Sequence, residues 1–316
     1  MSEPLSFNKP VIFISGPTAS GKTDLALYLK EYLPVSIDLI SVDSTLVYKG
    51  LDIGSGKPSQ AILQKSPHSL IDIVEPNEVF SVGLFRELAL EKIQAAFKHN
   101  RVPCLVGGTM MYFKALTSGL NQAPGRDDLF RQALLQRAKS EGVEKLHQEL
   151  AKIDKTSATK IHPNDYKRIE RALEIFYLTG KTKAEHIQKQ ALPVGFDIIH
   201  LALTPLNTPR EKLHENITLR FQNMLKLGFI EEVEHLMKRG DLSLELPSIR
   251  SVGYQQIWRY LQGEYNKETM IDKALTATRQ LAKHQLTWLR SWENVQFFDF
   301  AEPHLHEAIL KHLASR

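Results

Sequence analysis

Strand-type and helix-type patterns alternate over the first third of the chain. An apolar, β-branched run at residues 10–15 (PVIFIS) ends in a turn rich in Gly, Pro and Ser, and apolar side chains then recur at helical spacing over residues 24–32. Further strand-type runs occupy residues 37–42 and 102–106, with a helical pattern at about 84–98 between them. Strands that alternate with helices in this way predict a parallel sheet of the α/β class.

The pattern changes at about residue 117, where helices follow one another without strands. Helical spacing predicts elements at residues 127–138, 143–152, 165–178 and 183–189. A strand-type run at 198–204 then rejoins the sheet, followed by helices at about 209–226, 230–238, 253–261 and 269–290, a strand at 295–300 and a terminal helix. We therefore expect a core of residues 1–117 and 197–316, interrupted by an all-helical insertion of residues 118–196.

Composition limits the class of protein. The chain has 316 residues, which corresponds to about two domains at roughly 150 residues each. Hydrophobic residues make up 42% and charged residues 24%, so a sizeable core can form and disorder is excluded. The single cysteine, Cys104, excludes an intramolecular disulfide and a zinc site with several thiolates, and its apolar strand indicates a small core residue.

The sequence lacks the patterns of a membrane helix, an export signal, a zinc motif and a coiled coil. No apolar stretch approaches the roughly 20 residues of a membrane helix, and residues 1–10 lack the basic and apolar regions of an export signal. The 12 histidines form no HExxH pair, so we expect no structural metal. The sequence has no long heptad pattern. We expect a cytoplasmic monomer with no membrane contact.

Charge is distributed unevenly along the chain. The net charge of +4 is too small by itself to indicate a nucleic-acid partner. Residues 117–190, however, contain 14 Lys and Arg against 10 Asp and Glu, whereas the other residues contain 26 of each. The entire surplus therefore lies in the expected insertion.

One motif identifies a phosphate site. Residues 16–23 match GxxxxGK[ST] and lie between a predicted strand and a predicted helix, the context that supports a phosphate-binding loop (P-loop). Backbone N–H groups and Lys22 would bind phosphate oxygens, and Thr23 would bind Mg²⁺. The loop residues are Gly16, Pro17, Thr18, Ala19, Ser20, Gly21, Lys22 and Thr23. The motif alone leaves open whether a phosphoryl group is transferred or a pyrophosphate departs.

Two residues follow predicted strands and should lie beside this loop. Ligands of open α/β sheets bind beyond the carboxyl ends of the strands, where Asp43 and Thr109 are expected. Asp43 could hold Mg²⁺ through water, accept a proton, or cap a helix. Thr109 could donate to a leaving oxygen or cap the helix expected at residues 110–116. The glycine-rich segment 50–58 indicates a shaped substrate loop, with a plain surface turn as the alternative.

Seven sequence blocks, in order along the chain, resemble those of the bacterial tRNA dimethylallyltransferases, also called isopentenyltransferases. They are GPTASGKT, SVDSTLVYKGLDIGSGKP, HSLID, LVGGTMMYFKAL, IHPNDYKRIERALE, LPSIRSVGYQQ and TRQLAKHQLTWLR, and they extend from residue 16 to residue 290. The chain departs from the family at Ser55 and Gly56, where Thr and Ala are common, and at Gly125 and Arg126, where the insertion begins. These departures concern loops and not the reaction.

The resemblance implies transfer of a dimethylallyl group from dimethylallyl diphosphate to N6 of adenosine 37, just 3′ of the tRNA anticodon, with Mg²⁺ as the cofactor. The P-loop would then hold a diphosphate leaving group and not ATP. An exocyclic adenine amine is a poor nucleophile, and Asp43 is the base that we assign. Lys22, Thr23 with Mg²⁺, and Thr109 would stabilise the departing diphosphate, and the resemblance adds Arg220 as a further cation. Spacing alone would make Arg220 a solvated charge.

An enzyme that acts on a base must take that base out of its stack, which requires a pocket and a grip on the RNA. The resemblance implies that residues 250–255 contact the anticodon loop. We expect the anticodon stem-loop to contact Asp43, Ser44, Thr45, Leu46, Thr109, Arg131, Lys167, Arg168, Ile169, Glu170, Arg171, Arg250, Ser251, Val252, Gly253, Tyr254, Gln255, Arg279, Lys283, His284, Trp288 and Arg290. The cations at 167, 168 and 171 would otherwise form a solvated helix face. Trp288 and Trp292 either pack in the core or stack on unpaired bases.

Two other functions share the P-loop. A small-molecule kinase that uses ATP can also carry an inserted helical lid, and a non-enzymatic RNA-binding NTPase needs the same loop. The sequence lacks the Asn-Lys-x-Asp guanine motif, which argues against a GTPase. We therefore expect a P-loop parallel-sheet core with an inserted basic helical domain that acts on tRNA.

Overall fold

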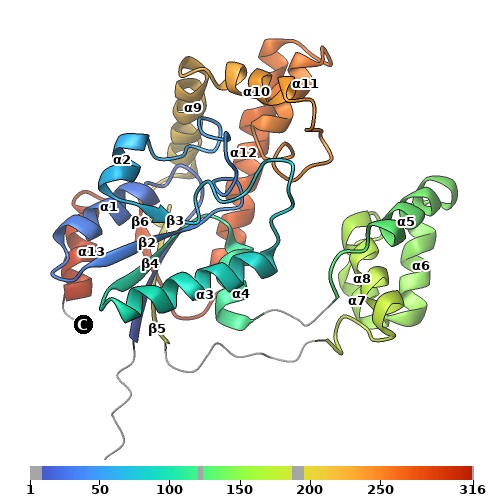
Figure 1. The fold of residues 1–316 in the computed structure, drawn as a ribbon, viewed down its shortest axis with the longest axis horizontal. Helices are drawn as coiled ribbons and strands as arrows, with labels where there is room; N and C mark the ends of the chain where they lie inside the picture. The colour runs from blue at the N-terminus through green and yellow to red at the C-terminus, as the bar shows by residue number, and fades with distance from the viewer. Residues whose placement is uncertain (1–8, 120–123, 187–195, 315–316) are drawn as a thin grey trace, which may run out of the picture. The chain divides into compact units, whose positions relative to one another are not determined.

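The computed structural model describes residues 9–119, 124–186 and 196–314. The chain forms two compact units (Figure 1). The first, the α/β core, contains Met1–Leu116 and Pro193–Arg316, and the second, the helical unit, contains Thr117–Leu192.

A six-stranded parallel sheet forms the centre of the α/β core, with the strand order β3-β2-β4-β1-β5-β6. The strands are β1 (Lys9–Ser15), β2 (Ile37–Val42), β3 (His68–Ser69), β4 (Val102–Gly107), β5 (Phe196–Thr204) and β6 (Val295–Asp299). The parallel sheet expected from the sequence is therefore confirmed. The run after the insertion rejoins it as β5, which pairs with β1 along its whole length. Only β3 was not expected, because two residues show no periodicity.

Helices cover both faces of the sheet, and successive residues of β1 point to opposite faces. Ile12 and Ile14 face α1 (Lys22–Tyr32) and α13 (Leu305–Ala314), in a cluster that also contains the fully buried Cys104. Val11 and Phe13 face the cluster that contains α3 (Val82–Lys98) and α4 (Met110–Ser118). Such three-layer packing explains why the strands read as continuous apolar runs.

Four further helices, α9 to α12, belong to the α/β core and appear together at the top of Figure 1. They are α9 (Arg210–Lys226), α10 (Phe229–Lys238), α11 (Tyr254–Leu261) and α12 (Lys267–Arg290). Phe229 of α10 and Tyr254 of α11 are fully buried and pack edge to face in the same cluster as β1. The short α2 (Gln60–Lys65) was not expected from the sequence.

The helical unit has its own core of Leu134, Leu146, Leu150, Ile169 and Leu173 with smaller neighbours. Its helices are α5 (Asp128–Glu141), α6 (Val143–Ile153), the unexpected α7 (Lys155–Lys160) and α8 (Tyr166–Thr179). Asp127 and Asp165 cap α5 and α8 with their side chains, so these helices begin one residue later than expected.

The helix expected at residues 183–189 is wrong over its described part. Residues 183–186 form a turn, and residues 187–189 lie outside the described ranges. The backbone N–H and the hydroxyl of Thr182 both donate to the Glu185 carboxylate, which closes the turn locally. Among the described helices of both units, none combines the length and apolar character needed to cross a membrane.

Candidate active site

The P-loop connects the end of β1 to the start of α1. A Cβ atom at Gly16 would lie 2.6 Å from the Leu203 carbonyl oxygen of β5, so only glycine fits there. Lys22 donates to the Pro17 carbonyl at 2.6 Å. Burial and the nearby Arg220 lower the pKa of Lys22 to about 7, although Asp43 opposes that shift. Several P-loop groups therefore converge at the carboxyl end of β1.

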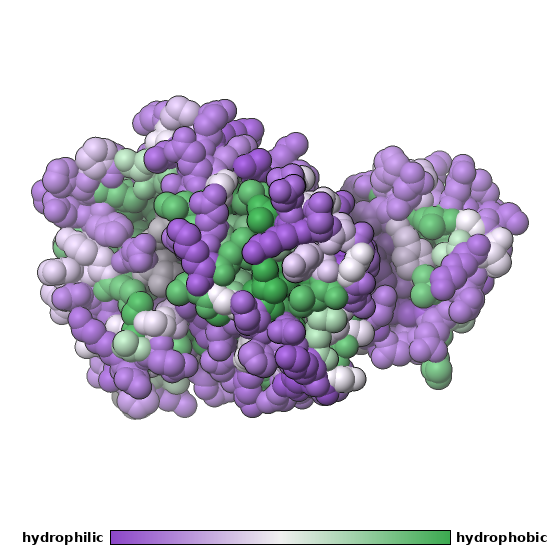
Figure 2. All heavy atoms as spheres, turned by 90° about the horizontal axis from the view of Figure 1, so that it is seen from above, coloured by the Kyte–Doolittle hydropathy of each residue, from purple (hydrophilic) through white to green (hydrophobic). Residues whose placement is uncertain are grey.

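The loop opens into a pocket of about 1020 Å³ within the α/β core. The pocket brings together many of the residues expected at the site, namely Thr18, Ala19, Ser20, Gly21, Lys22, Thr23, Asp43, Thr45, Leu46, Arg220, Val252 and Gly253. Leu219 of α9 and Leu227, which follows the end of α9, are 58% and 72% exposed and add an apolar wall to the pocket. The space-filling view also shows apolar side chains gathered on one face of the core, surrounded by hydrophilic ones (Figure 2). The pocket thus combines cations with apolar surface.

Asp43 lines the pocket and also closes a turn. One of its carboxylate oxygens accepts the N–H of Thr45 at 2.8 Å and the N–H of Leu46 at 3.2 Å. Asp43 therefore caps a turn and not a helix, so the alternative of a helix cap is wrong. Asp43 also lines the pocket, where the assigned base must lie. The hydroxyl of Thr109 accepts the Ser44 N–H at 3.0 Å. Asp43 and Thr109 therefore both stabilise the loop at residues 44–46, beside the pocket.

Arg220 faces the pocket and is half-buried, which contradicts the alternative of a solvated charge. Burial lowers the pKa of its guanidinium, against the attraction of Asp43 and Asp24. Arg220 donates to the Ser55 carbonyl at 3.2 Å. Gly56 makes this approach possible: its φ is +67°, and a Cβ there would lie 1.9 Å from a guanidinium nitrogen of Arg220.

The glycine-rich loop at residues 50–58 has a defined shape that α10 imposes. The Glu232 carboxylate accepts the N–H groups of Asp52, Ile53 and Gly54 at 3.1, 2.6 and 3.1 Å. It also accepts the Tyr254 hydroxyl at 2.6 Å. Lys57, whose side chain is only 3% exposed, is paired with Asp52 and Asp72 within the loop region. The interpretation as a plain surface turn is therefore wrong.

Tyr254 does not belong to a tRNA-contacting surface, which corrects one sequence prediction. Its side chain is fully buried against Phe229 and is hydrogen-bonded to Glu232. The neighbouring Ser251 has its hydroxyl 3.2 Å from the Thr45 hydroxyl, so the segment 250–255 meets the Asp43 loop. Arg250 is exposed, whereas Val252 and Gln255 are half-buried.

Sequence reasoning missed Gln285, which joins three parts of the site. Its side-chain oxygen accepts the Thr18 N–H at 2.9 Å, and its side-chain nitrogen donates to the Gly108 carbonyl at 2.8 Å. Gln285 is buried and lines the pocket. The signal that could have identified it is an amide side chain within the otherwise mostly apolar stripe of Ile271, Ala274, Thr278, Leu281 and Leu289.

The remaining predicted residues of α12 present a mixed surface. Arg279, Lys283, His284 and Arg290 are exposed. Trp288 is half-buried, with the Lys114 ammonium 5.4 Å from its ring centre. Trp292 is also half-buried, and packs against Phe113 with ring centres 6.3 Å apart. Trp288 therefore keeps some surface for stacking, whereas Trp292 contributes to the core.

The helical unit contains the second group of predicted tRNA contacts, and two of them are wrong. Ile169 is fully buried and Glu170 is 2% exposed, because both lie on the inner face of α8. Lys167 and Arg168 are 62% and 71% exposed. Lys167 pairs with Glu170 at 3.4 Å and lies 5.3 Å from the ring centre of Tyr166, and Arg168 pairs with Asp165 at 3.2 Å. These two cations remain accessible to a phosphate.

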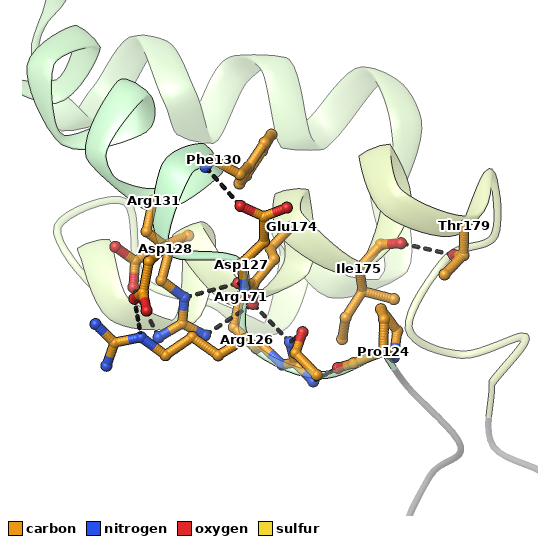
Figure 3. A network of polar contacts seen from close by, with 12 residues as sticks. Pro124, Arg126, Asp127, Asp128, Phe130, Arg131, Arg171, Glu174, Ile175 and Thr179 are labelled. Carbon is orange, nitrogen blue, oxygen red and sulfur yellow. Dashed lines mark hydrogen bonds and ion pairs between the residues drawn. The ribbon is translucent and has the colours of Figure 1, made fainter. Parts of the chain in front are cut away.

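Arg131 and Arg171 are tied to one buried carboxylate, that of Glu174 (Figure 3). Two guanidinium nitrogens of Arg131 donate to the Glu174 carboxylate at 2.7 Å each, and one nitrogen of Arg171 donates to it at 2.5 Å. The backbone N–H of Asp127 also donates to this carboxylate, at 2.9 Å. Burial alone would raise the pKa of Glu174, but these donors outweigh burial and lower it to about 2. Arg171 also donates to the Pro124 carbonyl at 2.7 Å. The two arginines therefore hold the helical unit together.

The loop, the sheet order and the pocket together define a P-loop α/β protein whose pocket can hold an oligophosphate next to an apolar group. Within the part of the chain that the structure describes, no group of three or more His, Cys, Asp or Glu side chains could hold a metal ion. The chain belongs to the IPP transferase family, whose model matches residues 46–292.

Relatives cover nearly the whole chain. The tRNA dimethylallyltransferase 2 of Hahella chejuensis (strain KCTC 2396) is 47% identical over 323 residues, which cover 97% of this chain and 96% of that protein. The full-length tRNA isopentenylpyrophosphate transferase of Bacillus halodurans has a crystal structure that is 36% identical, with a TM-score of 0.71 and coverage of 98% and 96%. A eukaryotic dimethylallyltransferase acting on tRNA is 26% identical, with a TM-score of 0.77 and coverage of 97% and 77%. The expected family and fold class are confirmed.

Proposed function

We propose that this chain is a tRNA dimethylallyltransferase, which transfers a dimethylallyl group from dimethylallyl diphosphate to N6 of adenosine 37 in tRNA and releases diphosphate. The observation that carries the proposal is the pocket in which the P-loop, Asp43 and Arg220 meet, in a chain of the IPP transferase family. Its apolar wall at Leu219 and Leu227 suits the hydrocarbon end of the donor.

The reaction forms a bond between N6 and the allylic carbon while the bond from that carbon to the diphosphate oxygen breaks. Asp43 accepts the N6 proton as the new bond forms, which offsets the weak nucleophilicity of the amine. The N–H donors of Thr45 and Leu46 fix one carboxylate oxygen of Asp43 and so orient the base.

The departing diphosphate gains negative charge, which must be met where it develops. Lys22 and the P-loop amides lie on one side, and Arg220 supplies a second cation across the pocket. Thr109 braces the Asp43 loop through Ser44 and would act beside the leaving oxygen.

Mg²⁺ is the proposed cofactor. Thr23, together with the Asp24 carboxylate in the same pocket, would offer oxygen donors of the kind that Mg²⁺ prefers. Such sites usually use one or two protein carboxylates and complete the coordination with substrate phosphates, which agrees with the small donor set here. The ion would neutralise diphosphate charge.

The tRNA partner would meet exposed cations on each unit. On the α/β core these are Arg250, Arg279, Lys283 and Arg290, with His284 beside them, and on the helical unit they are Lys167 and Arg168. Cations that contact phosphates give affinity without reading sequence. A cytoplasmic monomer remains part of the proposal.

The test is incubation of the chain with unmodified tRNA, labelled dimethylallyl diphosphate and Mg²⁺, in parallel with labelled ATP and candidate metabolites. We expect label on adenosine 37 of tRNA. The matched variant is Asp43→Asn, which keeps an oxygen acceptor for Thr45 and Leu46 but removes the base. Its transfer rate should fall by about 10²- to 10⁴-fold, with tRNA affinity within a few fold. Phosphorylation of a metabolite without prenylated tRNA would refute the proposal in favour of a kinase.

A further inference from the structure

We propose that Gln285 is a positioning residue that sets the P-loop against the carboxyl end of β4 for binding of the diphosphate. The inference rests on the proposed function, because it takes the pocket as the diphosphate site. Nothing in the P-loop motif or in the Asp43 and Arg220 pair requires a residue from α12.

Gln285 bridges two backbone segments that approach the diphosphate site from different strands. The N–H of Thr18, in the P-loop after β1, donates to its side-chain oxygen at 2.9 Å. Its side-chain nitrogen donates to the carbonyl of Gly108, just after β4, at 2.8 Å. Thr109, the next residue, binds the Asp43 loop through Ser44. One amide thus fixes the spacing between the P-loop and the segment that braces the proposed base.

A glutamine is the side chain that these two backbone groups require. The Thr18 N–H needs an acceptor and the Gly108 carbonyl needs a donor, and a side-chain amide presents one of each. Glutamate offers no donor, and methionine has a similar length but satisfies neither group. A Cβ at Gly108 would lie 2.5 Å from the Gln285 side-chain nitrogen, so any larger residue at position 108 would displace the Gln285 amide.

The position of Gln285 on α12 also separates its role from RNA binding. Lys283 and His284, the two preceding residues, are exposed, whereas Gln285 is only 7% exposed and lines the pocket. Loss of the amide would leave two backbone groups, the Thr18 N–H and the Gly108 carbonyl, without their partner at the wall of the pocket. The P-loop backbone would then adopt other conformations, and binding of diphosphate would have to shift it back to the conformation that binds.

The experiment measures binding of inorganic pyrophosphate with Mg²⁺ by titration calorimetry, without tRNA, to Gln285→Met and Gln285→Glu. Gln280→Met, an exposed glutamine of the same helix, is the matched control. We expect the dissociation constant to rise at least about tenfold in both Gln285 variants, more in the glutamate variant because it adds a negative charge. The control should stay within about twofold.

Steady-state transfer provides a second readout that a merely structural role would not move. The KM for dimethylallyl diphosphate should rise in Gln285→Met while the KM for tRNA stays near that of the parent chain. A pyrophosphate affinity within threefold of the parent in either folded Gln285 variant, or an equal loss in Gln280→Met, would overturn the inference. A parent chain that binds pyrophosphate but prenylates no tRNA would instead refute the proposed function, and the titration would still decide the role of Gln285.

Discussion

Replacement of Glu174 by Gln tests whether Arg131 and Arg171 hold the helical unit together. The Glu174 side chain is fully buried and accepts hydrogen bonds from both arginines and from the Asp127 N–H. Glutamine has nearly the same shape, but it replaces one acceptor oxygen with a donor and removes the negative charge. The variant therefore leaves two guanidinium groups around a neutral side chain.

The size of the effect follows from the pKa. Burial raises the pKa of Glu174 and the hydrogen-bond donors lower it, and the combined effect lowers this pKa from 4.5 to about 2. At about 1.4 kcal/mol per pKa unit, the folded state favours the ionised carboxylate by roughly 3 kcal/mol. Removing one partner of a buried ion pair costs about 3 to 5 kcal/mol. Arg131 and Arg171 are 22% and 32% exposed, so water can recover part of the loss. We expect Glu174→Gln to lower the stability of the helical unit by about 2 to 3 kcal/mol.

Hydrogen exchange detected by mass spectrometry can measure this stability over residues 128–179. All three tryptophans of the chain lie outside the helical unit, so tryptophan fluorescence reports the α/β core and should be unchanged. Because the pKa is lower in the folded state, the stabilisation is present above about pH 4.5 and is lost as the pH falls towards 2. The difference between variant and parent should therefore shrink through that range.

The matched control is Glu141→Gln in the same unit. Glu141 pairs with Arg137 at 3.0 Å, but this pair lies at the surface, so its loss should change the stability of the unit far less than the loss of the Glu174 network. Equal exchange rates in Glu174→Gln and Glu141→Gln, or a difference that does not depend on pH, would refute the reasoning.

Two further substitutions test the pocket and the RNA-facing cations. Arg220→Gln removes the guanidinium that lines the pocket, and the turnover number in steady-state assays should fall by about 10²-fold; unchanged turnover would show that Arg220 does not act on the departing diphosphate. Lys167→Ala with Arg168→Ala should lower the slope of tRNA affinity against salt by about 2 in binding titrations, because each phosphate contact contributes about one unit. An unchanged slope would make these cations an ordinary solvated face.

The sheet could be predicted almost completely from the sequence, because its buried strands appear as continuous apolar runs. The three missed elements, α2, β3 and α7, are two to six residues long, too short for any periodicity to show. The starts of α5 and α8 differ from the expected ones by one residue, because an Asp side chain caps each helix.

The site was predictable only where its residues are close in sequence or follow a strand. The P-loop is one continuous motif, and Asp43 and Thr109 directly follow β2 and β4. Gln285 and Glu232 act on backbone groups far away along the chain, which local patterns do not reveal.

The wrong tRNA contacts have a different origin. Ile169, Glu170 and Tyr254 were carried over with whole sequence blocks, although helical spacing already places Ile169 on the apolar face of α8. Within such a block, burial separates the residues that hold the fold from those that can meet RNA.

The Glu174 network has a consequence for how this enzyme can evolve. Arg171 and Glu174 fasten the segment at Pro124 and Asp127 onto α8, and the unit around them packs on a hydrophobic core of its own. Substitutions on the exposed face of α8, where Lys167 and Arg168 lie, therefore leave the network and the core of this unit in place. Under the proposed function, the tRNA contacts of this unit can then drift, or be redesigned in the laboratory, without loss of its fold.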